Sequence, residues 1–360
     1  MLIYVIVSFL ISFISCVFII KVCKRKKSLI TDNIHDGIQS FHKNPTPRLG
    51  GAGLFLAFMV TVALALGRGE SYKLIYTFVF LSSIPAFLSG LIEDVTGKLY
   101  PKIRMLFIVI SGVLAFFLAG AVVVRVDVPY VDALFQFQLV SFIFSLIAIA
   151  GLTNAVNIID GFNGLASMVS IMILLSISFV AYKLGDYFIV TSCVVMAGAL
   201  AGFFILNYPY GLIFLGDGGA YFTGFFIAVM SILLVKRHPE VSAWFAVLVN
   251  IYPIYETLFS IYRKKLLRKR SAMSPDGLHF HMLFYKVIVK RLLGTDNPIY
   301  RNPATSPFMW MINLLGVLPA LLFWRSTALC VVFSLIFILI YTSVYWSIIY
   351  KRMPRRKSKC

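Results

Sequence analysis

The sequence predicts an all-α polytopic membrane protein with about eleven transmembrane helices. Of its 360 residues, 60% are hydrophobic and only 13% are charged, whereas a soluble domain carries about 25% charged residues. Apolar runs recur along the chain, each close to the ~20 residues that cross ~30 Å of hydrocarbon as a helix. The basic residues between these runs are unequally distributed. Together these observations predict a membrane-embedded helical bundle.

The apolar runs define the predicted spans in order. The first run ends at Ile20, lacks a basic start and a small-residue cleavage site, and is followed by Lys21 and the cluster Lys24 to Lys27. We therefore expect a retained span rather than a removed signal peptide. The predicted spans cover residues 2–20, 50–67, 73–91, 104–124, 137–153, 165–182, 187–206, 218–235, 241–262, 307–324 and 326–350.

The distribution of Lys and Arg predicts the orientation of these spans. Placing alternate loops on opposite sides puts 26 of the 33 basic residues on one side and seven on the other. Because positive charge is retained on the cytoplasmic side, we expect an outside N-terminus and a cytoplasmic C-terminus. The net charge of +19 is then a topology signal and an attraction to membrane lipids with anionic headgroups, rather than a sign of nucleic acid binding.

Polar residues collect in the loops that are predicted to face the cytoplasm. Nine of the 14 acidic residues and four of the five histidines lie there, and the middles of the spans are almost free of ionisable groups. A transporter would place such groups near the bilayer midplane. We therefore predict a single transmembrane helical catalytic domain over residues 1–350, with its active site facing the cytoplasm, and a basic cytoplasmic tail over residues 351–360.

Two adjacent carboxylates, Glu93 and Asp94, end the third predicted span. Acidic groups so close to the apolar region are costly unless a cation or metal balances them, and a helix C-terminus disfavours them further. One interpretation is a solvated pair balanced by nearby basic residues, among them Lys102. The other is a magnesium or proton-transfer site beside a phosphate substrate.

The end of the fifth predicted span carries Asn154, Asn157 and Asp160 at spacings of three, which places them near one helical face. Asn163 follows, and it could simply cap the next helix. Capping explains one residue but leaves the amide and carboxylate face unexplained. We therefore predict a polar substrate-binding face here.

The next cytoplasmic loop runs from Asn207 to Asp217, which lies between glycines just before the eighth predicted span. A helix N-terminus attracts anions, so Asp217 could serve as an N-cap. Alternatively, the glycines allow close approach of a diphosphate or metal. Carboxylate oxygens suit magnesium, which binds substrate phosphates at the same time.

Further candidates lie in the ninth span and the loop after it. Glu256 is an intramembrane acid and hence a functional candidate, with Arg263 or the pair Lys264 and Lys265 as expected partners. The pair His279 and His281 follows a basic tract, but no third nearby ligand completes a zinc set. Recognition of a phosphate or base is the better interpretation.

Arg48 lies between two prolines and the pair Gly50-Gly51, at the start of the second span. Its guanidinium offers a bidentate fork for phosphate. The alternative is a rigid re-entry turn with a topology-setting arginine.

These segments, in this order, resemble the polyprenyl-phosphate N-acetylhexosamine-1-phosphate transferases (glycosyltransferase family 4, MraY/WecA-like). The resemblance covers residues 42–281 and rests on Pro-Thr-Pro-Arg-Leu-Gly-Gly before span two and on four further motifs. The family's paired aspartates fall on Glu93 and Asp94. Its three other motifs fall on Asn157 with Asp160, on Phe214 to Asp217, and on His279 with His281.

The resemblance implies a bacterial inner-membrane enzyme whose lipid substrate, undecaprenyl phosphate, attacks the β-phosphorus of a UDP-sugar and releases UMP. It implies Mg²⁺ as the cofactor, with Mn²⁺ as the alternative metal, and leaves a homodimer open. Asp217 and Asp94 would hold the metal, and Glu93 and Asp94 would place or deprotonate the acceptor. Asp160 is expected to be catalytic. The expected substrate-binding residues are Arg48, Lys102, Asn157, Asn163, Asn207, Glu256, His279 and His281.

Three positions depart from the family's pattern. Glu93 replaces the first Asp, Asn163 replaces a second Asp, and only two histidines stand where some members have three. These differences favour the initiators of surface polysaccharides, such as O-antigen, over the peptidoglycan translocase.

Two rival functions remain open at this point. A CDP-alcohol phosphotransferase would carry an Ala-Arg pair after Asp160-Gly161, where this chain has no arginine. A transporter or flippase of lipid-linked sugars would move its substrate intact.

Overall fold

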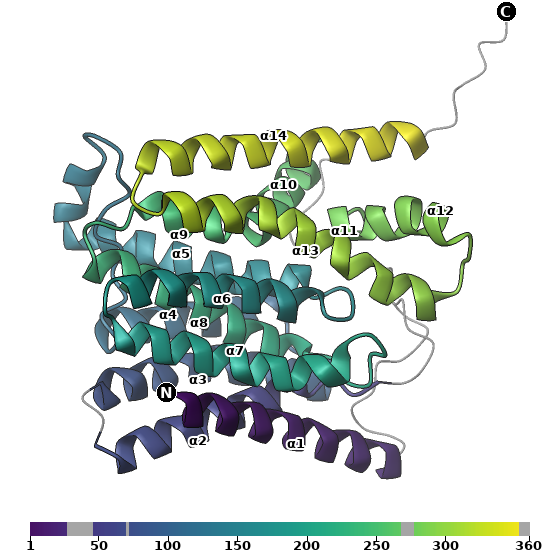
Figure 1. The fold of residues 1–360 in the computed structure, drawn as a ribbon, viewed down its shortest axis with the longest axis horizontal. Helices are drawn as coiled ribbons and strands as arrows, with labels where there is room; N and C mark the ends of the chain where they lie inside the picture. Colours follow the sequence, from purple (N-terminus) through teal and green to yellow (C-terminus); the bar gives the residue numbers. More distant parts are fainter. Residues whose placement is uncertain (27–45, 70–71, 268–276, 353–360) are drawn as a thin grey trace, which may run out of the picture.

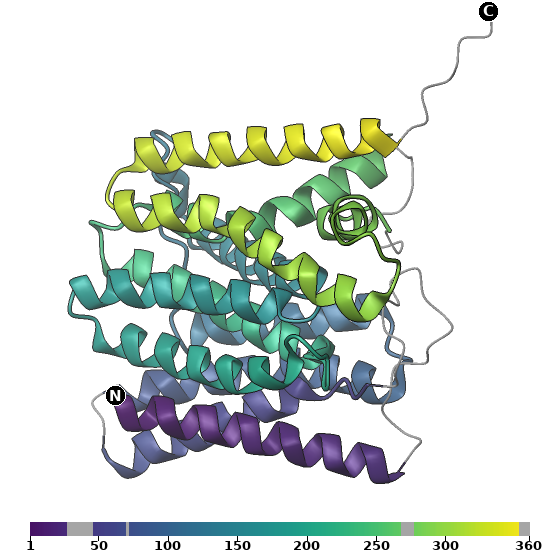
Figure 2. The ribbon, with the colours of Figure 1, turned by 45° about the vertical axis from the view of Figure 1, so that its right-hand side comes forward.

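The computed structural model describes residues 1–26, 46–69, 72–267 and 277–352, and in these ranges the regular structure is helical. Figures 1 and 2 show the long helices side by side along one direction, so that the loops gather at two ends of the bundle. The basic tract 268–270 and residues 353–360 of the predicted tail lie outside the described part. The long helices are α1 (Leu2–Lys26), α2 (Gly50–Gly67), α3 (Lys73–Thr96), α4 (Pro101–Phe117), α5 (Gln138–Ile159), α6 (Leu165–Lys183), α7 (Tyr187–Asn207), α8 (Gly216–Arg237), α13 (Pro298–Phe323) and α14 (Thr327–Arg352).

Seven shorter helical elements connect or interrupt the long ones. They are η1 (Asp132–Gln136), α9 (Ala243–Val249), α10 (Ile251–Tyr262), η2 (Arg263–Leu267), α11 (Phe280–Leu283), η3 (Phe284–Val289) and α12 (Lys290–Leu293).

The chain is a multi-pass membrane protein, as the sequence predicts, but fewer helices qualify as spans than the predicted eleven. Within the described ranges, nine helices are long and apolar enough to cross a membrane, and the bent pair α9 and α10 makes a tenth. The predicted span 104–124 is helical only as far as Phe117, and the chain turns at Gly120, whose φ is +65°. With 17 residues, α4 is about 25 Å long, shorter than the ~30 Å of hydrocarbon.

Helix α8 forms the centre of the bundle. Every residue from Gly218 to Val235 is buried, because this helix is apolar on all its faces. Its neighbours α2, α3 and α5 approach through small residues, which is how membrane helices pack without a hydrophobic driving force between them. A Cβ at Gly51 of α2 would lie 2.2 Å from the backbone nitrogen of Gly219, and one at Gly224 would lie 2.8 Å from the Cα of Thr153 in α5. The first turn of α8 therefore lies at the middle of one end of the bundle.

The predicted ninth span is broken into α9 and α10, which meet at an angle of 75°. The break lies at Asn250, and Pro253 in the next turn cannot donate a backbone hydrogen bond to Val249. The side chain of Asn250 instead donates to the carbonyl of Ala246 at 2.9 Å. The bend directs α10 away from the common helix direction and determines where Glu256 lies.

Two acidic residues at the other end of the bundle, Asp127 and Asp186, have structural roles. Burial opposes the ionisation of Asp127, but hydrogen bonds from the Ala243 N–H and from Arg125 outweigh it and lower the pKa of this carboxyl. Burial likewise opposes the ionisation of Asp186, and its bond to Arg237 lowers the pKa there. These carboxylates tie loops to helices.

Candidate active site

Asp94, near the C-terminal end of α3, caps the N-terminus of α8. Its Oδ1 accepts a hydrogen bond from the backbone N–H of Asp217, and its Oδ2 accepts one from Gly218, both at 2.9 Å. The first N–H groups of a helix lack partners within the helix and favour negative charge. The approach depends on Gly90, because a Cβ there would lie 2.3 Å from the nitrogen of Gly218. The Asp94 side chain is only 2% exposed and thus fixes where α8 begins.

Asp217 is the centre of a polar cluster at this end of the bundle. Its Oδ1 accepts a hydrogen bond from Asn157 Nδ2 at 3.0 Å, and its Oδ2 forms an ion pair with Arg104. Arg48 Nη2 lies 3.9 Å from Oδ1, and its Nε lies 3.9 Å from Asp94 Oδ1. The side chain of Asp217 is 13% exposed, so it can still be reached from outside the bundle. We call these residues, together with Asp160, the Asp217 cluster.

Asp160 lies one residue beyond the end of α5, in the turn before α6. Burial raises the pKa of its carboxyl to about 7; the charge of Arg48 acts against this rise and that of Asp217 adds to it. Asp160 therefore lies close enough to both residues to respond to their charges. A carboxyl that titrates near neutral pH can both accept and release a proton.

Glu256 of α10 holds the segment that contains both histidines. Its Oε1 accepts a hydrogen bond from the backbone N–H of Phe280 and lies 3.0 Å from His279 Nδ1. Its Oε2 accepts a hydrogen bond from the Tyr341 hydroxyl at 2.8 Å and lies 3.9 Å from His281 Nδ1. At 1% exposure, Glu256 is out of reach of a substrate and serves as an anchor. We call this arrangement the Glu256 hub.

The Glu256 hub packs directly against the turn that carries Asp160. The imidazole of His281 fills the space beside Gly161, where a Cβ would lie 3.1 Å from its Nε2. The ring of Phe162 meets His281 edge to face, with centroids 5.6 Å apart. Motifs that are about 120 residues apart in the chain therefore form one continuous site.

The acidic residues of the cluster fit a magnesium ion that is shared with a substrate. Among the described residues, no group of three or more His, Cys, Asp or Glu side chains is arranged to hold a metal. Both oxygens of Asp94 bond to the α8 N-terminus, which argues against the metal role predicted for it. Asp217 and Asp160 remain as neighbouring carboxylates whose repulsion a cation would relieve. Magnesium commonly uses one or two carboxylates, with water and phosphate oxygens completing its shell.

Comparison with known proteins finds a family match over the part of the chain that carries most of the Asp217 cluster. Residues 76–235 match the model of glycosyl transferase family 4. This range contains Asp94, Asn157, Asp160 and Asp217. Over this range the chain is similar to glycosyl transferase family 4. The sequence-based assignment to this family is thus confirmed.

The relatives of this chain carry two kinds of name. A probable undecaprenyl-phosphate N-acetylglucosaminyl 1-phosphate transferase of Bacillus subtilis is 27% identical over 279 residues, which are 77% of this chain and 76% of the relative. A phospho-N-acetylmuramoyl-pentapeptide-transferase of Clostridium perfringens is 29% identical over 67% of this chain and 77% of its own length. An undecaprenyl-phosphate alpha-N-acetylglucosaminyl 1-phosphate transferase of Thermotoga maritima is 27% identical over 69% and 71%.

The structure places two predicted site residues at the edge of the Asp217 cluster. Glu93 Oε2 accepts a hydrogen bond from the Leu99 N–H at 2.7 Å and closes the turn after α3. Lys102 is exposed in the first turn of α4. Arg104, two residues after Lys102, makes the ion pair with Asp217 instead.

Asn163 and Asn207 lie inside the protein, where they join loops. Asn207 accepts a hydrogen bond from Gly164 N–H at 2.6 Å and donates one to Ile213 O at 2.7 Å. Asn163 Nδ2 donates to Pro209 O at 2.8 Å. Both residues are about 5% exposed or less, so their contacts favour a structural role over the substrate contact predicted for them.

The structure differs from the sequence interpretation in the partners of Glu256 and in the importance of Arg104. Arg263, an expected partner of Glu256, donates to the carbonyl of Leu278 at 2.6 Å, and the hub instead contains His279 and Tyr341. The sequence indicated Arg104 only as one of the basic residues that could balance Glu93 and Asp94, because its partner Asp217 is 113 residues away.

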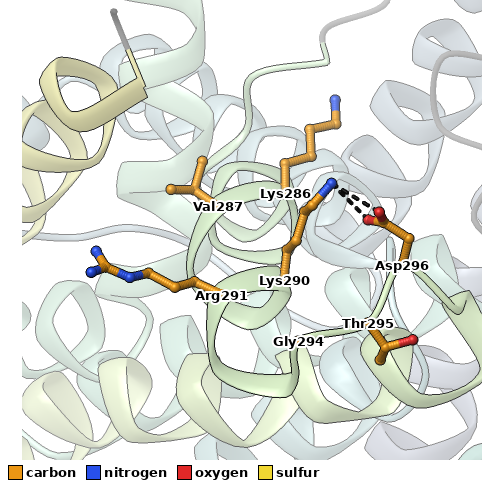
Figure 3. A pocket seen from close by; sticks show the side chains of 7 residues that line it. All are labelled: Lys286, Val287, Lys290, Arg291, Gly294, Thr295 and Asp296. Carbon is orange, nitrogen blue, oxygen red and sulfur yellow. Dashed lines mark hydrogen bonds and ion pairs between the residues drawn. The ribbon is translucent and has the colours of Figure 1, made fainter.

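An open hollow of about 480 Å³ lies beyond the hub, along η3 and α12 (Figure 3). It is lined by Lys286, Lys290 and Arg291, and its carboxylate, Asp296, pairs with Lys290 and with Arg301 of α13. The hollow is therefore cationic. It lacks the clustered acids that distinguish the Asp217 cluster.

Proposed function

We propose that this protein transfers an N-acetylated hexosamine-1-phosphate from a UDP-sugar to undecaprenyl phosphate, releasing UMP and a lipid diphosphate sugar. The observation that carries this proposal is the convergence of Asp217, Arg104, Asn157 and Arg48 at the N-terminus of the central helix. Such a site combines cations with carboxylates, and so suits a reaction between two phosphate groups.

The two arginines of the cluster would bind the phosphates. Arg48 is 42% exposed and can reach an incoming phosphate, whereas Arg104 is 19% exposed and is held by Asp217. Catalysis of phosphoryl transfer depends mainly on in-line positioning and on neutralising charge. Arg48 would thus neutralise the approaching anions, and Asn157 would keep Asp217 in place through its hydrogen bond.

Asp160 would handle the proton of the acceptor phosphate. Its carboxyl, with a pKa raised to about 7 by burial, is matched to a phosphate monoester, whose second pKa is about 6. The deprotonated lipid phosphate then attacks the β-phosphorus of the donor, and UMP leaves. Asp217 would hold Mg²⁺, which when bound would supply positive charge against the donor diphosphate.

The sugar is proposed to be N-acetylglucosamine or a close analogue. Two of the relatives described above are named for N-acetylglucosaminyl 1-phosphate transfer. Glu93 and Asn163 also depart from the family's usual pattern, which favours an initiator of surface polysaccharides over the peptidoglycan translocase. The product would begin a cell-envelope polysaccharide at the cytoplasmic face of a bacterial plasma membrane.

A donor panel tests this proposal. Purified protein in vesicles with undecaprenyl phosphate and Mg²⁺ is given labelled UDP-N-acetylglucosamine, UDP-N-acetylgalactosamine or UDP-N-acetylmuramoyl-pentapeptide. We expect label to enter the lipid from an N-acetylhexosamine donor with an equal release of UMP, and Asp217→Asn to abolish both. Movement of intact lipid-linked sugar across the vesicle without UMP release would identify a transporter instead. Failure of all three donors would overturn the proposal.

A further inference from the structure

Helix α14 lies along the edge of the bundle in both views (Figures 1 and 2). Much of its surface is exposed, including Leu335 at 54% and Leu339 at 66%, as expected of a helix that faces lipid. Tyr341 and Tyr345 are the exceptions that matter here, because each is only 1% exposed. They are four residues apart, so they project from the same face of the helix.

The hydroxyl of Tyr341 bonds to Glu256, the anchor of the histidine segment. Its Oη lies 2.8 Å from Glu256 Oε2, while Oε1 of the same carboxylate accepts the N–H of Phe280 at 3.0 Å. The ring of Tyr341 also packs on Phe280, with centroids 4.6 Å apart. Tyr341 therefore contacts this segment both through Glu256 and directly.

The hydroxyl of Tyr345 bonds to the residue just before the histidines. It donates to the carbonyl of Leu278 at 3.2 Å, and it accepts a hydrogen bond from Arg263, which also donates to Leu278 O at 2.6 Å. Tyr341 and Tyr345, on one face of α14, thus hold residues 278 to 280 at two points.

We propose that Tyr341 and Tyr345 are positioning residues, and that α14 holds His279 and His281 in place for the donor substrate. This inference rests on the proposed function, since it assigns the histidine segment to donor binding. The hydrogen bonds of the two tyrosines described above run to Glu256, Leu278 and Arg263. Their effect would therefore pass through Glu256 and Leu278.

Tyr341→Phe tests the proposal, because it removes one hydroxyl and keeps the ring. The matched control is Tyr255→Phe. Tyr255 of α10 bonds to Thr342 of α14 at 2.7 Å, so the control removes a hydrogen bond between the same two helices and leaves Glu256 untouched. Tyr345→Phe is the second test variant, and it keeps the proposal testable if Tyr341→Phe does not fold.

We expect Tyr341→Phe to lower kcat/KM for UDP-N-acetylglucosamine about tenfold, since a hydrogen bond to a charged buried group is lost. The KM for undecaprenyl phosphate should stay within about twofold of the wild type. Hydrogen–deuterium exchange should rise in the peptide over residues 278–283 in Tyr341→Phe and stay unchanged in Tyr255→Phe. We expect Tyr345→Phe to behave in the same direction.

The possible results separate the two proposals. If the wild type transfers sugar and both Phe variants at positions 341 and 345 match Tyr255→Phe in kcat/KM, the positioning role is refuted. If the wild type transfers no sugar, the proposed function fails. The exchange measurement then still decides whether the tyrosines hold the histidine segment.

Discussion

Replacing Gly90 by alanine probes the contact on which the candidate site is built. A Cβ at this position would lie 2.3 Å from Gly218 N and 2.4 Å from the carbonyl carbon of Asp217. Favourable separations between such atoms are about 3.5–4.0 Å. Both neighbours are backbone atoms, so no rotamer change can relieve the clash. Helices α3 and α8 must therefore move apart by about 1 Å.

The size of the effect follows from this displacement. The bonds of 2.9 Å from Asp94 to the α8 N-terminus would be lengthened beyond normal hydrogen-bond distance. A misplacement of about 1 Å in a catalytic site can lower activity about 100-fold. Overpacking by one methyl group costs about 1–3 kcal/mol of stability. We therefore expect Gly90→Ala to lose most of its sugar transfer and to melt at a lower temperature.

Gly151→Ala is the control for this experiment. Gly151 lies in α5, and a Cβ there would have nothing within 4 Å. Alanine in an open helical position stabilises a helix by up to about 1 kcal/mol relative to glycine. Transfer to undecaprenyl phosphate and thermal melting in detergent are measured for both variants. A Gly90→Ala protein as active and as stable as Gly151→Ala would refute the close packing of α3 on α8 and the site derived from it.

Three further predictions concern single side chains. Asp217→Asn should lower the rate of sugar transfer at least about 100-fold at saturating Mg²⁺. The melting temperature should fall by no more than a few degrees, because an amide oxygen can still accept the hydrogen bond from Asn157. Near-normal turnover would exclude Asp217 from the reaction. Burial raises the pKa of Asp160 to about 7, so between about pH 4 and 7 the folded state binds more protons than the unfolded state. Without divalent cations, the free energy of unfolding should therefore fall as the pH rises through this range. Asp160→Asn should remove that part of the slope in a series of melts from about pH 5 to 8, and an unchanged slope would contradict the assignment. Asn163→Asp should lower the melting temperature, because a carboxylate cannot donate to Pro209 O; the same melts check this, and equal stability would show that the bond contributes little.

The fold class and most helix starts follow from the sequence, but the helix ends at the site do not. The predicted third and fifth spans end at residues 91 and 153, whereas α3 continues to Thr96 and α5 to Ile159. Hydrophobicity locates the part of a helix that lies in lipid, whereas backbone hydrogen bonding continues into polar residues. Asn157 is helical for this reason, although it lies beyond the apolar run.

The roles within the acidic pair could not be predicted from its residue types. Adjacent residues on a helix point about 100° apart, so only one of Glu93 and Asp94 can face α8. In the structure Asp94 faces it, and Glu93 bonds to Leu99 in its own connecting turn. The choice depends on the rotation of α3 against α8, which Gly90 and Gly218 determine.

The position of Asp217 explains why a charged cluster can exist at the end of the central helix of an apolar bundle. Residues Gly218 to Val235 of α8 are buried, so a carboxylate among them would lose its hydration without gaining a partner. In the first turn, Asp217 remains 13% exposed, and Arg104 and Asn157 reach it from two neighbouring helices. Asp94 occupies the free N–H groups of that turn, so Asp217 is left available to cations and substrate. The structural role of Asp94 and the functional role of Asp217 therefore both follow from the burial of α8. An active Asp94→Asn variant with an undisturbed α8 N-terminus would contradict this assignment.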